Sequence, residues 1–220
     1  MKHLMTTTAS SSSRTNLGSN KFFWLLAILL LSYWTYGWFY SIDQQDWMIE
    51  NILVVICLSL LVITKKWHGL SDLSYLCIFL FVLFHLYGAF YAYTQNALGA
   101  WLQNRYHLWR NPYDRIVHFS FGFFMAYPFR EILINKFRVK GRASWLLPIE
   151  IAFSFGTIFE IIEWGVAVVT TKETGETYVA TQGDVWDAHK DIMMAAIGAA
   201  ASMLITYIII RRKNLKYNKQ

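Results

Sequence analysis

The run FFWLLAILLLSYWTYGWFY occupies residues 22–40 and contains no charged side chain. A helix needs about 20 mainly apolar residues to cross the hydrocarbon core of a bilayer, and this run is long enough. Its end is rich in aromatic side chains, which suit the interface between lipid and water, and it lacks a small-residue cleavage site. The run therefore predicts an uncleaved membrane-spanning helix.

Five further apolar runs follow along the chain, and each is long enough to cross a membrane. They occupy residues 47–64, 73–93, 114–134, 144–170 and 187–210. The composition agrees, because 55% of the residues are hydrophobic and only 15% are charged, whereas soluble domains average about a quarter charged residues. We therefore expect an all-α, polytopic membrane helix bundle with about six transmembrane helices, in one domain over residues 22–210.

Basic residues are distributed unevenly between the two sides that six spans would create. Fourteen Lys and Arg residues lie before the first run, in the second and fourth loops and after the last run, against five on the other side. Because loops rich in Lys and Arg stay in the cytoplasm, both chain ends are predicted to be cytoplasmic. Residues 1–21 are predicted to form a disordered tail and residues 211–220 a basic one. This topology explains the net charge of +6, so no nucleic-acid partner is expected.

Three sets of ionisable residues are predicted to lie in one layer beneath the outer surface. The spacing within each set places its members on one face of a helix. The sets are Asp114 with His118, Glu160 with Glu163, and Asp184 with Asp187 and Asp191. An ionised group deep in a membrane costs about 2.5–3.5 kcal/mol on insertion scales, so surplus acids must pair, bind protons or bind a cation. The basic side chains expected nearby are Arg115 and Lys190, which are outnumbered by the six acids.

A structural role is the better explanation for some residues of these sets and for some polar residues outside them. Asp114 and Asp184 are suited to cap helices, and His85 to be a hydrogen-bonded packing residue. Arg130, near the cytoplasmic end, is expected to pair with Glu131. For the remaining residues, a functional site and a network that merely locks the bundle are equally supported. These residues are His118, Glu160, Glu163, Asp187 and Asp191.

Three segments of the chain carry a family resemblance. They are YDRIVHFSFGFFMAYPFREIL (113–133), FGTIFEIIEW (155–164) and TQGDVWDAHKDIMMAAIGA (181–199). They are similar to segments of the YjdF-type inner membrane proteins, a bacterial family of unknown function. More distantly, the Asp-x-x-x-His, paired-Glu and spaced-Asp helices resemble the VanZ-like arrangement. The family resemblance implies a multi-pass protein of the bacterial inner membrane with six or so spans, and it implies no established reaction.

Three hypotheses for the polar layer stay open. The first is a metal-dependent enzyme acting on a lipid or lipid-linked substrate, since carboxylates and imidazoles suit Mg²⁺, Mn²⁺ or Zn²⁺. Its predicted metal ligands are His118, Glu160, Asp187 and Asp191, and Glu163 is the predicted catalytic base. The second is a proton-coupled transporter subunit, and the third is an accessory protein whose polar network is structural. Membrane lipid is the expected partner in each case, and a homo-oligomer is compatible with all three.

Overall fold

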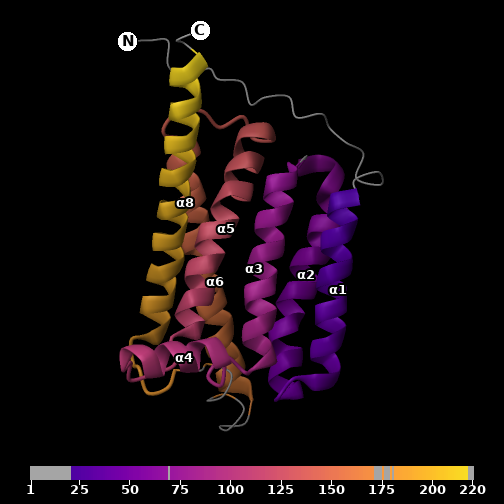
Figure 1. Cartoon of the computed structure of the whole chain (residues 1–220), viewed down its shortest axis with the longest axis vertical. Coiled ribbons are helices and arrows are strands. Elements are labelled where there is room, and N and C mark those ends of the chain that lie inside the picture. Colours follow the sequence, from indigo (N-terminus) through magenta and orange to yellow (C-terminus); the bar gives the residue numbers. More distant parts are fainter. Residues whose placement is uncertain (1–20, 69, 171–174, 176–178, 180, 218–220) are drawn as a thin grey trace.

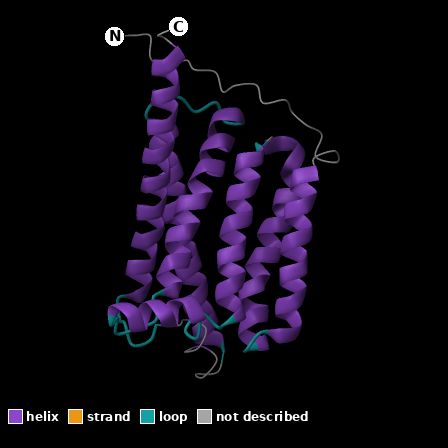
Figure 2. Ribbon diagram, in the orientation of Figure 1, coloured by secondary structure: helices purple, strands orange, loops and turns teal. Residues whose placement is uncertain are grey.

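The computed structural model describes residues 21–68, 70–170, 175, 179 and 181–217, which form a bundle of helices (Figures 1 and 2). The six long helices are α1 (Lys21–Tyr40), α2 (Gln44–His68), α3 (Asp72–Phe90), α5 (Tyr113–Asn135), α6 (Ala143–Val169) and α8 (Asp187–Tyr217). Successive long helices run in opposite directions, so the start of α1 and the end of α8 lie at the same end of the bundle (Figure 1). The short helix α4 (Ala97–Tyr106) lies across the opposite end.

Four helices of the described chain are long and apolar enough to cross a membrane by themselves. They are α1, α3, α6 and the segment Asp187–Leu215 of α8. Helix α5 is less apolar because it buries polar residues inside the bundle, among them Asp114, His118 and Ser120. The predicted all-α membrane helix bundle is therefore confirmed. Six spans and the cytoplasmic position of both ends stay predictions.

The structure differs from the sequence prediction at three places. Helix α4 was not predicted, because a helix of 10 residues is too short to span a membrane. It begins at an Asn96 cap, whose Oδ1 accepts a hydrogen bond 3.1 Å from the Gly99 backbone nitrogen. Helix α8 continues to Tyr217, into the predicted basic tail, where basic side chains suit the negative end of the helix dipole. The predicted disordered tail over residues 1–21 lies outside the described residues except for Lys21, which begins α1.

Helices α5 and α8 approach each other closely through small residues. A Cβ atom on Gly122 would lie 1.8 Å from the Ala195 carbonyl oxygen, and one on Gly198 would lie 2.1 Å from the Phe119 carbonyl oxygen. Both positions therefore exclude any side chain, because such contacts are far inside van der Waals distance. The contact fixes the register of the two helices and brings their first turns together, where the ionisable residues of both helices lie.

A buried aromatic cluster joins α2, α3 and α5 at the end of the bundle where α4 lies. Trp47, Tyr93 and Tyr113 are at most 6% exposed and pack around Ala89 and Val117. The hydroxyl of Tyr113 donates a hydrogen bond of 3.0 Å to the Phe84 carbonyl oxygen, which satisfies its polar end. The cluster therefore holds the start of α5 against α3.

Candidate functional site

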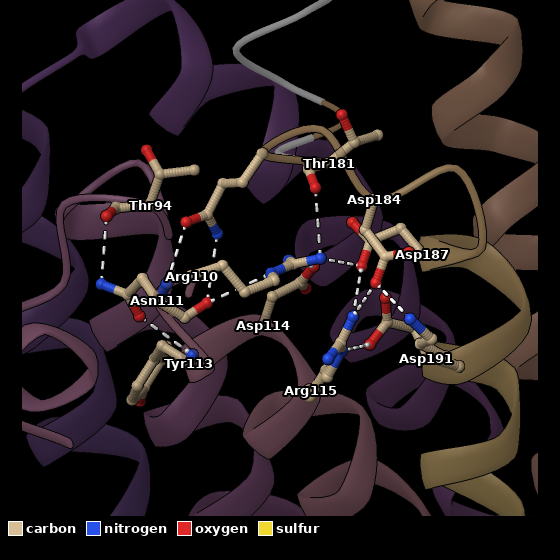
Figure 3. A network of polar contacts seen from close by, with 12 residues as sticks. Thr94, Arg110, Asn111, Tyr113, Asp114, Arg115, Thr181, Asp184, Asp187 and Asp191 are labelled. Atoms are coloured by element: carbon tan, nitrogen blue, oxygen red, sulfur yellow. Dashed lines mark hydrogen bonds and ion pairs between the residues drawn. The ribbon is translucent and has the colours of Figure 1, made fainter. Parts of the chain in front are cut away.

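The polar residues of the candidate site lie where α5 and α8 begin, and Figure 3 shows many of them from close by. Most of them are well buried even though they are ionisable. The site residues that are at most 9% exposed are Arg110, Asp114, His118, Glu163, Asp184, Asp187 and Asp191. Buried charges are stable only when they are paired, hydrogen-bonded, protonated or bound to an ion, so the partners of each residue decide what the site can do.

Asp114, His118 and Asp191 form a group with the spacing of a metal site. Each offers one ligand atom, and the three atoms all lie within 4.8 Å of one another. Asp114 and His118 share one face of α5, and Asp191 lies one turn into α8. Two carboxylates with one imidazole are suited to several divalent cations. Asp114 was not among the predicted metal ligands, whereas His118 and Asp191 were.

Helix α6 brings the two glutamates to the same group. Glu160 Oε1 lies 3.2 Å from His118 Nε2, and Asp114 Oδ1 lies 3.6 Å from the same nitrogen. Glu163, the predicted catalytic base, is buried one turn further along α6 and interacts electrostatically with Glu160 and Asp191. The structure thus places Glu160 beside His118, and Glu163 beside Glu160.

Asp187, a predicted metal ligand, lies instead in a network of ion pairs. Its Oδ1 accepts a hydrogen bond from Arg110 and another of 3.3 Å from Arg115. Arg115 also binds Asp184, and it reaches Asp191 with a separation of 4.0 Å between Nε and Oδ1. Two guanidinium groups offset the charge of Asp187. Asp187 is therefore less suited to hold a metal ion than Asp114 is.

Arg110 is the residue that the sequence prediction missed. The sequence predicts only Arg115 and Lys190 as basic residues near the site, yet Arg110 is 2% exposed, and its Nη2 lies 3.7 Å from Asp114 Oδ2. Its guanidinium also donates a hydrogen bond of 3.2 Å to the Thr181 carbonyl oxygen. The spacing of four residues between Arg110 and Asp114 was an available signal, because residues four apart can form an ion pair.

The neighbouring Asn111 links the segment before α5 to the segment before α8 through hydrogen bonds. Its backbone N–H donates a hydrogen bond of 2.9 Å to Gln182 Oε1, and its carbonyl accepts one of 3.1 Å from Gln182 Nε2. Its side chain donates to the carbonyl oxygens of Thr94 and Asn96 at 3.0 and 3.1 Å. These hydrogen bonds connect the turn before α4 to the segments that precede α5 and α8 (Figure 3).

Asp184 lies outside the membrane-spanning helices and makes the contacts of a paired carboxylate. Lys190 Nζ lies 2.6 Å from its Oδ2. The hydrogen bond from Lys190, together with those from Trp186 and Arg115, lowers the pKa of Asp184 to about 2. Its Oδ1 accepts a hydrogen bond of 3.1 Å from the Trp186 backbone N–H, in the turn just before α8, and the capping role predicted for Asp184 stays a prediction.

The capping role predicted for Asp114 is wrong. Helix α5 is capped by Pro112 without a side-chain hydrogen bond. The backbone N–H of Tyr113 is instead satisfied by Asn111 Oδ1 at 3.0 Å. Asp114 therefore lies within the first turn of the helix, where its carboxylate is available to Arg110 and His118.

Two residues near the other end of α5 have separate partners rather than the predicted pairing with each other. Glu131 accepts hydrogen bonds from the backbone N–H and the hydroxyl of Ser71, the latter at 2.9 Å, and from the hydroxyl of Ser74. The Arg130 guanidinium lies 3.8 Å from the centroid of the Trp145 ring. Glu131 thus joins α5 to the start of α3, and Arg130 joins it to α6.

Comparisons with known proteins agree with the membrane architecture. A family model described as "Predicted membrane protein (DUF2238)" matches residues 22–212. The inner membrane protein YjdF of Escherichia coli strain K12 is 32% identical over 163 residues, covering 74% of this chain and 78% of the relative. No solved structure matches significantly. The region that the family model matches, residues 22–212, contains the whole candidate site.

Proposed function

The chain belongs to the DUF2238 family of predicted membrane proteins, and we propose that in this membrane protein the buried polar site binds a divalent cation and acts as an enzyme. The predicted YjdF-type resemblance and inner membrane location are confirmed by the family model and by the relative from Escherichia coli. The observation that carries the proposal is the group of ligand atoms from Asp114, His118 and Asp191, all within 4.8 Å of one another.

The balance of charge around this group favours a cation. Six carboxyl groups gather at the site, and the described residues supply three basic side chains as ion-pair partners. The acids are Asp114, Glu160, Glu163, Asp184, Asp187 and Asp191; the bases are Arg110, Arg115 and Lys190. Each base also contacts Asp184 or Asp187, so the bases only partly offset the charges of Asp114 and Asp191. Bound protons or a bound cation would balance the remaining carboxylates.

Two buried carboxylate oxygens in the described structure lack a hydrogen-bond partner. Glu160 Oε1 and Asp191 Oδ1 are inaccessible to solvent, and the basic groups beside them, His118 at 3.2 Å and Arg115 at 4.0 Å, make no hydrogen bond to them. A buried acceptor without a partner costs about 1–3 kcal/mol, so a ligand that binds both oxygens would stabilise the fold. The donor set of carboxylates and one imidazole suits Mg²⁺, Mn²⁺ or Zn²⁺.

The side chains of the site would each have a role in an enzyme of this kind. Asp114, His118, Asp191 and Glu160 would hold the ion, and the ion would supply a Lewis acid or a more acidic water. Glu163 would accept a proton as the general base. Because the site lies in the outer layer of the predicted topology, a lipid or lipid-linked molecule is the substrate class that we propose.

The test is metal analysis of protein purified without chelator, combined with thermal melting. We expect bound metal, a lower melting temperature after chelation, and recovery when Mg²⁺, Mn²⁺ or Zn²⁺ is added, since binding to the folded state alone is stabilising. Asp191→Asn should abolish this response. Glu150→Gln, which changes an exposed carboxyl group of α6, is the matched control and should keep it. A melting curve that chelator leaves unchanged would rule out the cation site.

A proton-coupled transporter subunit is the second candidate. It is favoured by the same surplus of buried carboxyl groups, because acids that interact closely exchange protons as a coupled set. Proteoliposomes with a trapped pH-sensitive dye would report proton movement driven by an imposed pH gradient. Movement that survives chelation and is lost in Glu160→Gln would favour transport over the enzyme.

A further inference from the structure

A second buried polar site lies between α2 and α3, apart from the ion pairs of α5 and α8. Glu50 of α2 and His85 of α3 are 3% and 5% exposed, and Glu50 Oε2 lies 3.8 Å from His85 Nε2. The other ring nitrogen of His85, Nδ1, is hydrogen-bonded to the Tyr93 hydroxyl at 2.7 Å. Glu50 Oε2 and His85 Nε2 have no hydrogen-bond partner among the described residues, although they face each other.

The hydrogen bond between Tyr93 and Nδ1 links the imidazole to a second proton donor or acceptor. When Glu50 is neutral, its proton is donated to Nε2 of His85, and the neutral ring keeps its own proton on Nδ1 and donates it to the Tyr93 oxygen. When Glu50 is ionised, the Tyr93 hydroxyl donates to Nδ1 instead, and the ring carries its proton on Nε2, facing the carboxylate. The two side chains are thus arranged to share or exchange a proton after a shift of less than 1 Å, which would bring their atoms to hydrogen-bond distance.

The charged and titratable groups around Glu50 do not include a basic ion-pair partner in the described part of the chain. The groups that act on the site are Asp46 of α2, Tyr93, Asp114 and His118 of α5, and Glu163 of α6. Most of them are acids, and none is a Lys or Arg. An ionised carboxylate in such a place is costly, so a bound proton is the ligand that neutralises it. A metal ion is less suitable here, because the described group with metal-ligand spacing is the one around Asp114.

We propose that Glu50 and His85 form a proton-binding site that exchanges its proton through Asp46 with the end of the bundle where α2 begins. Asp46 precedes Glu50 by one helical turn, is 5% exposed, and has a buried Oδ2 without a hydrogen-bond partner in the described structure. Its spacing from Glu50 places both carboxyl groups on one face of α2. In the exchange, one proton moves between Glu50 Oε2 and solvent, and no electrons are transferred.

Infrared difference spectroscopy between low and high pH tests the site directly. The wild type should show bands of protonated carboxylic acids, and Glu50→Gln should lose one of them. Glu150→Gln, the control in an exposed position, should keep the band that Glu50→Gln loses. The melting temperature of the wild type should fall at high pH, partly because Glu50 loses its proton. The amide of Glu50→Gln resembles the neutral acid and stays uncharged, so the melting temperature of this variant should fall less. An identical difference spectrum in Glu50→Gln and the wild type would overturn the proposal.

A second variant guards against a failure of Glu50→Gln to fold. Tyr93→Phe keeps Glu50 and His85 but removes the hydrogen bond to Nδ1, so it should shift the carboxyl band and the ring-nitrogen signals of His85 in nitrogen NMR. An unchanged band and unchanged signals would overturn the proposal. The difference between Glu50→Gln and the wild type should persist with and without chelator, so the proton site can fail or succeed independently of the cation site.

Discussion

Gly122 of α5 lies against the backbone of Ala195 in α8, so closely that a Cβ atom would lie 1.8 Å from the Ala195 carbonyl oxygen. This contact determines how far α5 and α8 stand apart, and therefore how far Asp114 and His118 lie from Asp191. The close packing of small residues is thus a condition for the candidate site as well as for the fold.

Gly122→Ala should destabilise the protein by about 1–3 kcal/mol, because the added methyl group must push α8 away. It should also weaken any binding of a divalent cation, since Asp191 moves with α8. The measurement is chemical unfolding in detergent, together with the response of the melting temperature to Mn²⁺. Gly165→Ala in α6 is the matched control, because a Cβ atom there meets nothing within 4 Å. Equal stability of the two variants would show that the close contact is absent.

Arg110 and Asp187 should be strongly coupled in a double-mutant cycle. Removing one member of a buried ion pair leaves the other without its partner and costs about 3–5 kcal/mol. We expect Arg110→Met and Asp187→Asn each to destabilise the fold, and the double variant to cost less than the two changes added together. Arg105→Met on exposed α4 should change stability by no more than about 0.5 kcal/mol. Simple additivity of the two site variants would contradict the ion pair.

The orientation of the bundle can be tested with a reporter that is active only outside the cytoplasm. Fused near residue 105, at the end of α4, it should be active, and near residue 139, between α5 and α6, it should be inactive. The basis is the distribution of Lys and Arg over the loops. Activity at residue 139 would contradict the orientation and would place the candidate site on the cytoplasmic side.

The long helices could be predicted from the sequence because lipid leaves a spanning segment few alternatives to an apolar helix. The site could be predicted only in part. The helical spacing of Asp114 with His118 and of Glu160 with Glu163 was visible, and the structure brings Asp114 and Glu160 to His118. The partners that depend on tertiary contacts were not visible, since Arg110 reaches Asp187 across 77 positions of the chain.

Glu50 is a different kind of omission. Its spacing of four residues from Asp46 was present in the sequence, but both residues are close to the start of a predicted span, where acids are commonly solvated. Glu50 is nevertheless only 3% exposed, as a result of tertiary packing that no local pattern indicates. The same packing places Glu50 opposite His85.

The pairing of Asp184 should appear in the acid stability of the protein. The pKa of Asp184 is about 2 in the folded state, against about 3.9 for an unperturbed aspartate. Because the folded-state pKa is the lower one, the contribution of Asp184 to stability is complete above about pH 4 and is lost as the pH falls through about 2. The melting temperature of the wild type should therefore exceed that of Asp184→Asn near neutral pH, and the difference should disappear across this window. Lys190→Met should reduce the same difference, since the hydrogen bond from Lys190 is the largest cause of the low pKa. A difference that does not change with pH would mean that the Asp184 carboxylate is not held by Lys190 and Arg115.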